Sequence, residues 1–257
     1  MKNSTIRLAL ALAFALACGS AQAADNVRVT RDFTDTVTPA EQQAYVAGSK
    51  AFNQCLRQHD FKYNLTAWTH ETGDTYSYSY VTDPVPWATF DAMDAAVKAC
   101  LPVIGSQVNP HLKGESSAFM QAMPELSHRY GQKTAPPPLI EVTYFTLKPG
   151  HQAVETFMAA AKKIAAAAAK SNRPHEYQIV RLLDAGDGAP DFLLVIPSRN
   201  WADLGTEPDP DVWKMVESVY GKSDAVAIRQ SINDAVAKQS SHVDSYNAGL
   251  SYIAAGK

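Results

Sequence analysis

The chain lacks a surplus of positive charge, since its 257 residues carry 23 Lys and Arg against 26 Asp and Glu. This balance excludes the broad basic footprint of nucleic-acid-binding proteins, so we expect no nucleic-acid partner. Beyond the first 17 residues the chain has no apolar run of the roughly 20 residues that a membrane-spanning helix needs. We therefore expect no integral membrane segment in the mature protein. With 46 % hydrophobic residues the composition is that of a globular chain of about one or two domains.

Residues 1–23 have the features of a signal peptide. Lys2 and Arg7 form a positive n-region, Leu8–Ala17 is apolar, and Ala21-Gln22-Ala23 offers a small-x-small cleavage pattern. The sequence therefore predicts a periplasmic or secreted protein. Loss of the two basic residues with this segment changes the formal net charge from −3 to −5.

Lipid attachment at Cys18 is the alternative fate of the N-terminus. Leu16-Ala17-Cys18-Gly19 resembles part of a lipoprotein box, but Ala15 stands where an aliphatic residue is usual. Cleavage after Ala23 is therefore the favoured hypothesis.

The chain has few cysteines, three in all, and no CxxC pair. With Cys18 in the leader, Cys55 and Cys100 remain as an even pair in an oxidising compartment. Both lie on the apolar stripe of a predicted helix, so we predict a structural disulfide; two buried free thiols are the alternative. In the chain-entropy model a bridge that closes this loop stabilises the fold by about 4 kcal/mol.

The order of predicted elements repeats on either side of a proline-rich linker. Residues 24–131 predict a strand, a helix, two strands and a helix, and residues 139–257 repeat this order. The linker, residues 132–138, contains Pro136-Pro137-Pro138, which favours polyproline II. We therefore predict an α+β fold in which two tandem ferredoxin-like β-α-β-β-α units form an intramolecular α/β barrel.

Capping patterns and apolar periodicity set the boundaries of the predicted elements. Thr38-Pro39-Ala40-Glu41 predicts a capping box at the start of the first helix. The predicted helices run from this box to about His59, from Thr89 past Cys100, from Lys148-Pro149-Gly150 through the polyalanine, from an Asp209-Pro210 cap to Gly221, and from Ser223 to about Ile253.

A tryptophan follows the third strand of each unit, in Pro86-Trp87-Ala88 and Asn200-Trp201-Ala202. With this element order, the chain resembles the dimeric α/β-barrel superfamily, which includes the antibiotic-biosynthesis-monooxygenase-like and stress-responsive barrel proteins. The resemblance implies sheet-against-sheet packing of the two units, with small ligands between sheet and helices or inside the barrel. It covers most of the mature chain, and its members range from cofactor-free oxygenases to haem degraders.

Haem degraders of this superfamily need a histidine on the helix after the tryptophan. The sequence has none between Trp87 and His111 or between Trp201 and His242, so we expect no haem and no other cofactor. His70-Glu71 does not continue as a zinc motif, and the other histidines show no ligand spacing, so no metal site is expected. We expect both tryptophans to be packing anchors.

Strand parity predicts a pocket inside the barrel. If Gly73-Asp74 is a two-residue turn, Trp68 and His70 lie opposite Ser79 and Ser77 on one face. The opposite face, with Tyr76, Tyr78 and Tyr80, is more apolar and is expected to pack under the helices. The predicted ligand-binding residues are Asn64, Thr66, Trp68, His70, Ser77, Ser79 and Arg181.

Arg181 is included because the second unit has inward-facing positions that correspond to those of the first unit. These positions are Tyr177, Ile179, Arg181 and Leu183. A buried guanidinium needs an anionic partner, which is either Glu141 on the neighbouring first strand or a bound anion. A filled interior, with a space-filling tryptophan and a satisfied histidine, is the alternative to a pocket.

The favoured functional hypothesis is an exported barrel protein that binds a small aromatic or anionic molecule in its interior. The alternative is a cofactor-independent monooxygenase-like enzyme with His70 as the general base. The sequence leaves open whether the protein is an enzyme, because it offers no group that would orient His70.

Overall fold

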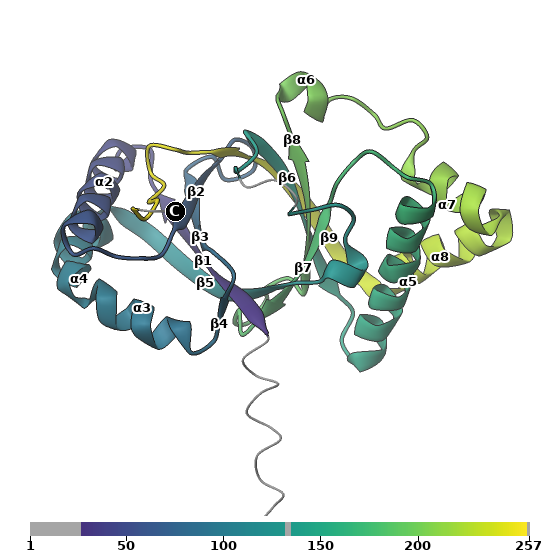
Figure 1. The fold of residues 1–257 in the computed structure, drawn as a ribbon, viewed down its shortest axis with the longest axis horizontal. Coiled ribbons are helices and arrows are strands. Elements are labelled where there is room, and N and C mark those ends of the chain that lie inside the picture. The colour runs from purple at the N-terminus through teal and green to yellow at the C-terminus, as the bar shows by residue number, and fades with distance from the viewer. Residues whose placement is uncertain (1–26, 132–134, 256–257) are drawn as a thin grey trace, which may run out of the picture.

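The protein is a closed β-barrel with helices packed on two opposite sides (Figure 1). The computed structural model describes residues 27–131 and 135–255. The predicted signal peptide, Cys18 and the first part of the linker lie outside the described residues. Within the described parts, no helix is long and apolar enough to cross a bilayer.

Eight antiparallel strands close the barrel. Their order is β3-β2-β9-β6-β8-β7-β5-β1, and pairing of β1 with β3 completes the ring. A short ninth strand, β4, extends the edge of β1. The strands are β1 (Arg28–Val37), β2 (Leu65–His70), β3 (Ser77–Thr82), β4 (Val85–Pro86), β5 (Leu112–Ala122), β6 (Leu139–Leu147), β7 (Gln178–Leu183), β8 (Phe192–Ser198) and β9 (Val236–Tyr246).

Each half of the chain contributes four adjacent barrel strands in the same arrangement. The order is β5-β1-β3-β2 in the first half and β9-β6-β8-β7 in the second. The halves join through the β2–β9 and β5–β7 pairs, so the barrel interior belongs to both.

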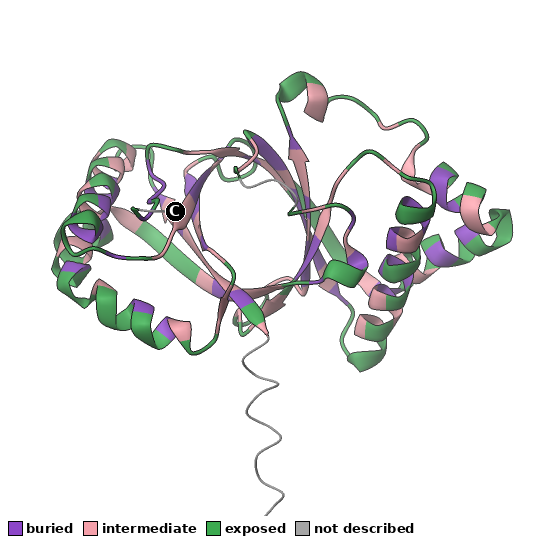
Figure 2. Ribbon diagram, in the orientation of Figure 1, coloured by how far each residue is buried: buried purple, intermediate pink, exposed green. Residues whose placement is uncertain are grey.

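The helices cover the outer face of the barrel on both sides, and their outward surfaces are exposed (Figure 2). Amphipathic sequences explain this placement, because one apolar stripe per helix packs on the sheet. The helices are α2 (Gln42–Gln58), α3 (Thr89–Val97) and α4 (Leu101–Val103) in the first half, and α5 (His151–Lys170), α6 (Trp201–Leu204), α7 (Val212–Tyr220) and α8 (Lys222–Ala235) in the second.

Cys55 on α2 and Cys100, which follows α3, form a disulfide, and this prediction is confirmed. Their Cα atoms are 5.8 Å apart, and the bridge spans a sequence separation of 45 residues. It lies in an apolar cluster with Leu56, Phe90 and Met93. The bridge thus ties together the two helical segments that cover the first half.

Gly48 allows α2 to touch the π-helical turn Ile104–Val108. A Cβ at this position would stand 1.8 Å from the main-chain oxygen of Gln107, so a larger residue would push the two segments apart. The close contact fixes the helical cover at one end of the first half.

A strand that was not predicted follows the last helical segment of each half. The helical segment that begins at Thr89 continues through short turns past Cys100 to His111, as predicted, and β5 follows it, whereas α8 ends at Ala235, where β9 begins. The helix predicted to continue to Ile253 is therefore wrong beyond Ala235. Much of β5 and β9 is polar and exposed, so neither has the alternation that marks a half-buried strand. Pairing with a neighbour on each side imposes the strand conformation.

Two predicted helix caps are also wrong. Glu41 is the N-cap of α2 and makes no side-chain capping bond, so the capping box does not form. The N-cap of α7 is Asp211, whose Oδ1 accepts hydrogen bonds from the N–H groups of Trp213 and Lys214, rather than the Asp209-Pro210 pair.

The two post-strand tryptophans differ in their surroundings. Trp87 packs against Phe119, with ring centroids 4.6 Å apart, and against Phe90, which agrees with the expected anchor. Trp201 is 55 % exposed at the start of α6, so the expectation of a packing anchor there is wrong.

Candidate functional site

The described residues enclose two cavities of the size that small molecules occupy. The sheet–helix cavity, about 570 Å³, lies between the outer face of the first half's strands and α2, α3 and the turns that follow. The barrel cavity, about 730 Å³, lies inside the barrel.

The sheet–helix cavity has mostly apolar walls. Helices and strands both supply aromatic and aliphatic side chains, which suits the faces of a flat apolar molecule. The main apolar contributors are Phe33, Phe52, Phe90, Met93, Ile104 and Val108.

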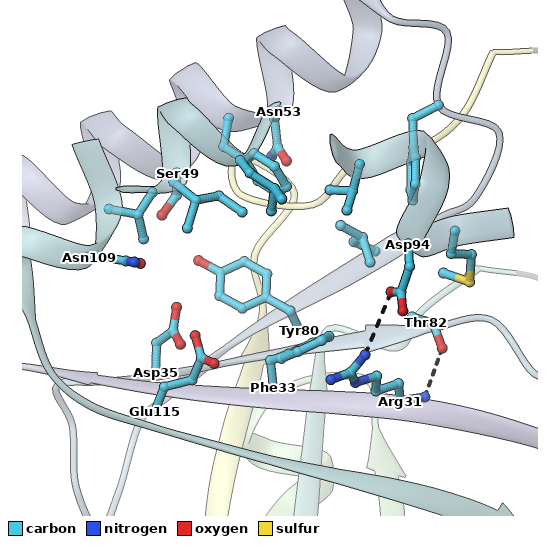
Figure 3. Close-up of a pocket in the computed structure, with 18 of the residues that line it drawn as sticks. Arg31, Phe33, Asp35, Ser49, Asn53, Tyr80, Thr82, Asp94, Asn109 and Glu115 are labelled. Carbon is cyan, nitrogen blue, oxygen red and sulfur yellow. Dashed lines mark hydrogen bonds and ion pairs between the residues drawn. The ribbon is translucent and has the colours of Figure 1, made fainter. Parts of the chain in front are cut away.

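Acidic and hydroxyl groups gather at one end of this cavity. Asp35 on β1 is paired directly with Tyr78 on β3 and with Glu115 on β5, so all three residues share the helix-facing side of the sheet. Figure 3 shows Asp35 and Glu115 side by side below the hydroxyl of Tyr80. The location of the tyrosines agrees with the expectation that they pack under the helices.

The Asp35 carboxylate is held at one oxygen and unpaired at the other. The Tyr45 hydroxyl on α2 donates a hydrogen bond of 2.7 Å to Oδ2, and it lies 2.8 Å from the Tyr80 hydroxyl. Since Tyr45 gives its only proton to Asp35, Tyr80 is the donor between the two tyrosines. Oδ1 of Asp35 is buried and accepts no hydrogen bond. A proton shared with the neighbouring Glu115 carboxyl group, or a donor from a bound molecule, would satisfy this oxygen.

Burial raises the pKa of Asp35 to about 6, and the hydrogen bond from Tyr45 lowers it. The charge of Glu115 and a hydrogen bond shared with its carboxyl group raise it further. Burial likewise raises the pKa of Tyr80 to about 12 and moves the pKa of Tyr45 far above its usual value. Both tyrosines therefore stay protonated as donors near neutral pH, where Asp35 is able to accept a proton.

The opposite end of the cavity carries a cation. Arg31 lies over the Phe33 ring at 4.5 Å, and its Nη1 is 3.9 Å from Oδ1 of Asp94 (Figure 3). The Asp94 side chain is 67 % exposed, so this end of the cavity meets solvent. The cavity thus runs from a solvent-facing arginine to a buried carboxylate.

The raised pKa of Asp35 predicts that stability falls as pH rises. The folded protein holds this proton up to about pH 6, whereas the unfolded chain releases it near 3.8, so the folded state binds more protons between these values. We expect the free energy of unfolding to drop by up to about 3 kcal/mol from Asp35 alone between pH 4 and pH 7. Urea titrations at several pH values measure it. Asp35→Asn should flatten this dependence, and an unchanged slope in that variant would contradict the assignment.

The barrel cavity contains three of the predicted ligand-binding residues. Thr66, Trp68 and Ser79 line it, and Trp68 pairs with Ser79 across β2 and β3, in the predicted register. Most of its remaining wall is aliphatic, from strands of both halves. The structure therefore brings together the core of the predicted set on the inner face.

The other predicted residues of the first half contact protein groups. His70 is buried, with Nε2 3.1 Å from Oγ of Ser79, and Ser77 Oγ lies 2.9 Å from the hydroxyl of Thr36. Asn64 donates to Asp83 and accepts from the N–H of Ala254, so it holds the returning C-terminal segment.

Arg181 is exposed on the outer face of β7, and its predicted place inside the barrel is wrong. Gln178, Val180 and Leu182 face the barrel cavity instead. The connection between β7 and β8 (residues 184–191) is longer than the connection between β2 and β3 (residues 71–76). Alignment of the two halves on their turns therefore shifted the predicted position of β7 by one residue. A slip of one residue exchanges the two faces of a strand.

The proposed ionic partner of Arg181 also fails on topology. β8 lies between β6 and β7, so Glu141 on β6 is not on a neighbouring strand. The charge of Arg181 is solvated and needs no buried anion.

In the second half, the space that corresponds to the sheet–helix cavity is filled. Phe157 on α5 stacks on Phe192 at 4.8 Å and contacts Phe145 at 5.3 Å between ring centroids. The two halves therefore share strand order but differ in their capacity to hold a molecule.

Haem, which the resembled superfamily binds in some members, does not fit the sheet–helix cavity. No histidine is among the residues that line it, and the Tyr80 hydroxyl is already engaged with Tyr45. The donor set lacks the axial ligand that haem iron needs.

Sequence patterns did not reveal the acidic end of this cavity. The group consists of residues from four separate elements that meet only in the folded protein, where α2 packs on one face of the sheet. These residues are Asp35, Tyr45, Tyr80 and Glu115. The one available signal was a carboxylate at a helix-facing position of β1, since such a position is normally apolar.

No protein-family model matches the chain, and no curated protein matches it. Solved structures do resemble it. An anthrone oxidase-like protein aligns with a TM-score of 0.56 and 12 % identity over 91 % of this chain and 96 % of its own. A chlorite dismutase variant from Candidatus Nitrospira defluvii aligns with a TM-score of 0.52 and 10 % identity over 86 % of this chain and 92 % of its own.

A candidate monooxygenase from Lactobacillus acidophilus NCFM aligns with a TM-score of 0.50 and 10 % identity, over 86 % of this chain and 94 % of its own. At these identities the likeness concerns the fold alone. The chain thus shares its barrel fold with these three proteins.

Proposed function

We propose that the protein is an enzyme that binds a small, flat, largely apolar molecule in the sheet–helix cavity and removes a proton from it through Asp35. The observation that carries this proposal is the unpaired, buried Oδ1 of Asp35 at the polar end of an apolar cavity. Leaving a buried carboxylate oxygen without a partner is costly, and such groups concentrate where a ligand supplies the missing donor.

The surrounding groups suit a general base. Tyr45 fixes the carboxylate through Oδ2 and leaves Oδ1 without a hydrogen bond, on a residue that lines the cavity. The pKa of about 6 lies close to neutral pH, where a base is both ionised and able to hold the abstracted proton. In this proposal Asp35 replaces His70 as the base, because His70 lies on the inner face of the barrel.

The fold neighbours suggest oxidation by dioxygen as the reaction class. After Asp35 takes a proton from an activated CH₂ group, the resulting carbanion would react with dissolved dioxygen as the oxidant. Overall the CH₂ group and O₂ become a carbonyl group and water, so atoms and electrons balance without a cofactor. Two of the structural neighbours are an anthrone oxidase-like protein and a candidate monooxygenase, which supports this class.

Oxygen consumption with anthrone as the probe substrate tests the proposal. Anthrone is flat, apolar and carries an acidic CH₂ group between its rings, and its oxidation to anthraquinone consumes one O₂ and forms one water. We expect protein-dependent consumption above the protein-free rate. Equal rates with and without protein, for anthrone and its hydroxylated analogues, would contradict the proposed reaction.

The barrel cavity is a second candidate site, for binding a small aromatic molecule. Its specific support is the open space beside Trp68, Thr66 and Ser79. A ligand there would stack on the indole and bond to the two hydroxyls.

Truncation of Trp68 tests the openness of this space. Because one side of the indole faces a cavity, we expect Trp68→Ala to lower the free energy of unfolding by less than the about 3–5 kcal/mol typical of packed aromatic residues. Phe157→Ala, between two other rings, is the matched control and should show the full loss. Equal losses in the two variants, measured by urea unfolding, would indicate a filled interior.

We further infer that the two halves are tandem ferredoxin-like repeats and that the mature protein is exported. The identical strand order of the halves supports the first inference. The Cys55–Cys100 disulfide and the leader-like residues 1–23 support the second.

A further inference from the structure

A polar cluster lies on the inner face of the barrel, apart from the sheet–helix cavity. His70 on β2 is paired directly with Asp244 on β9, and His242 is two residues before Asp244 on the same strand. Successive alternate residues of a strand face the same side, so all three side chains point inward. Their exposed fractions are only 8 %, 12 % and 5 %.

The ligand-type atoms of this cluster lie close together, and the rings of His70 and His242 stack with their centroids 4.4 Å apart. Nε2 of His242 is 3.0 Å and Nε2 of His70 is 3.8 Å from Oδ1 of Asp244, and all three atoms lie within 4.8 Å of one another. Nε2 of His242 is hydrogen-bonded at 3.2 Å to the other carboxylate oxygen, Oδ2, whereas Oδ1 is buried and accepts no hydrogen bond. A buried carboxylate oxygen that faces two imidazole nitrogens without a hydrogen bond has the position of a metal ligand.

The charges of the barrel interior also favour a cation. Asp32 on β1 and Asp244 both line the barrel cavity. Within the described residues, their side-chain partners are Thr34 for Asp32 and the two histidines for Asp244, and neither carboxylate pairs with a lysine or arginine. Two enclosed carboxylates are costly without a compensating positive charge.

A Ser-His-Asp nucleophile is the competing interpretation, and the geometry disfavours it. In a catalytic triad the serine and the aspartate contact opposite nitrogens of the imidazole. Here Ser79 Oγ and Asp244 Oδ1 both lie near Nε2 of His70, at 3.1 and 3.8 Å. The same nitrogen cannot accept a proton from serine and donate one to the carboxylate.

We propose that His70, His242 and Asp244 bind a divalent first-row transition-metal ion inside the barrel. Two imidazoles and one carboxylate form a ligand set that such ions use in proteins. With bonds of about 2.1 Å, neighbouring ligand atoms stand about 3.0–3.4 Å apart, so His242 and Asp244 already match. His70 must approach Oδ1 and turn out of its stacking on His242 to direct Nε2 at the same ion, and Asp32 and water remain to complete the coordination.

Sequence patterns did not indicate this site, because His70 and His242 are far apart in the chain and have no motif spacing. The proposal is independent of the function assigned to the sheet–helix cavity, since the cluster lies on the inner face of the barrel. Its test therefore needs a readout of metal binding rather than of oxidation.

Titration of the chelator-treated full-length mature protein with Co²⁺ tests the site. We expect one equivalent to bind and to give the visible ligand-field absorption of Co²⁺ with nitrogen ligands, and Zn²⁺ should displace it. His242→Ala and Asp244→Asn should weaken binding by about 100-fold or more. His151→Ala, which removes an exposed histidine on α5, is the matched control and should bind as the wild type does.

A second measurement on the wild-type protein covers the case in which a variant fails to fold. Addition of one equivalent of Zn²⁺ should shift the imidazole ¹⁵N resonances of His70 and His242 and leave those of His59 and His151 unchanged. Failure to bind Co²⁺ at millimolar concentration, or shifts confined to the exposed histidines, would overturn the proposal. A salt-like pair of protonated His242 with Asp244 would then account for the cluster.

Discussion

Asp35→Asn should lower anthrone-dependent oxygen consumption by about 10²–10⁴-fold, the contribution typical of a positioned general base. Asparagine has nearly the same shape, and its amide oxygen can still accept the hydrogen bond from Tyr45. It cannot accept a proton at neutral pH. The loss should therefore appear in kcat, with KM changed much less, because the apolar walls that bind the substrate remain.

Matched variants separate this role from a general effect of charge. Asp94→Asn removes a carboxylate at the solvent-facing end of the same cavity and should retain most of the activity. Asp35→Glu keeps the base but displaces it, so partial activity is expected. Full activity in Asp35→Asn, with a folded protein by circular dichroism, would exclude Asp35 as the base.

Removal of the disulfide should cost about as much stability as the truncation of a packed aromatic side chain. Cys55→Ala with Cys100→Ala opens a loop with a sequence separation of 45 residues, and the chain-entropy model predicts a loss of about 4 kcal/mol. The bridge joins α2 to the segment after α3, and both contribute to the cover of the sheet–helix cavity. We therefore expect weaker binding of small molecules there as well as a lower urea midpoint.

Reduction of the disulfide in the wild-type protein is the control for the loss of the two cysteine side chains in the double variant. Treatment with a strong reductant should reproduce most of the effect of the double variant, since both remove the same cross-link. A double variant as stable as the oxidised wild type would show that packing around the bridge, rather than the covalent link, determines the stability of this region.

Local sequence signals predicted the elements whose pattern is strong. The disulfide, the β2–β3 register around Trp68 and Ser79, and the tyrosines under the helices all follow from periodicity within single elements. β5 and β9 were missed because their polar sequences become strands only through pairing with neighbours distant in the chain. The parity error at Arg181 arose from a difference in loop length between the halves.

The candidate sites were harder to predict than the fold. The predicted pocket used residues of one hairpin, and its core does lie on the barrel's inner face. The acidic end of the sheet–helix cavity combines Asp35 with residues of α2, β3 and β5, so it depends on tertiary arrangement. The same is true of His70 and His242, which the β2–β9 pairing brings together.

Methyl NMR of the protein with 2-naphthol, a flat two-ring molecule with an acidic hydroxyl, tests the central claim most directly. The claim is that such molecules bind between the sheet and the helices with their acidic group at Asp35. We predict saturable shifts of the methyl groups of Met93, Ile104 and Val108, which Asp35→Asn should weaken. Shifts confined to Ile140, Val142 and Val180 of the barrel cavity, or no saturable shifts in either set, would contradict the account.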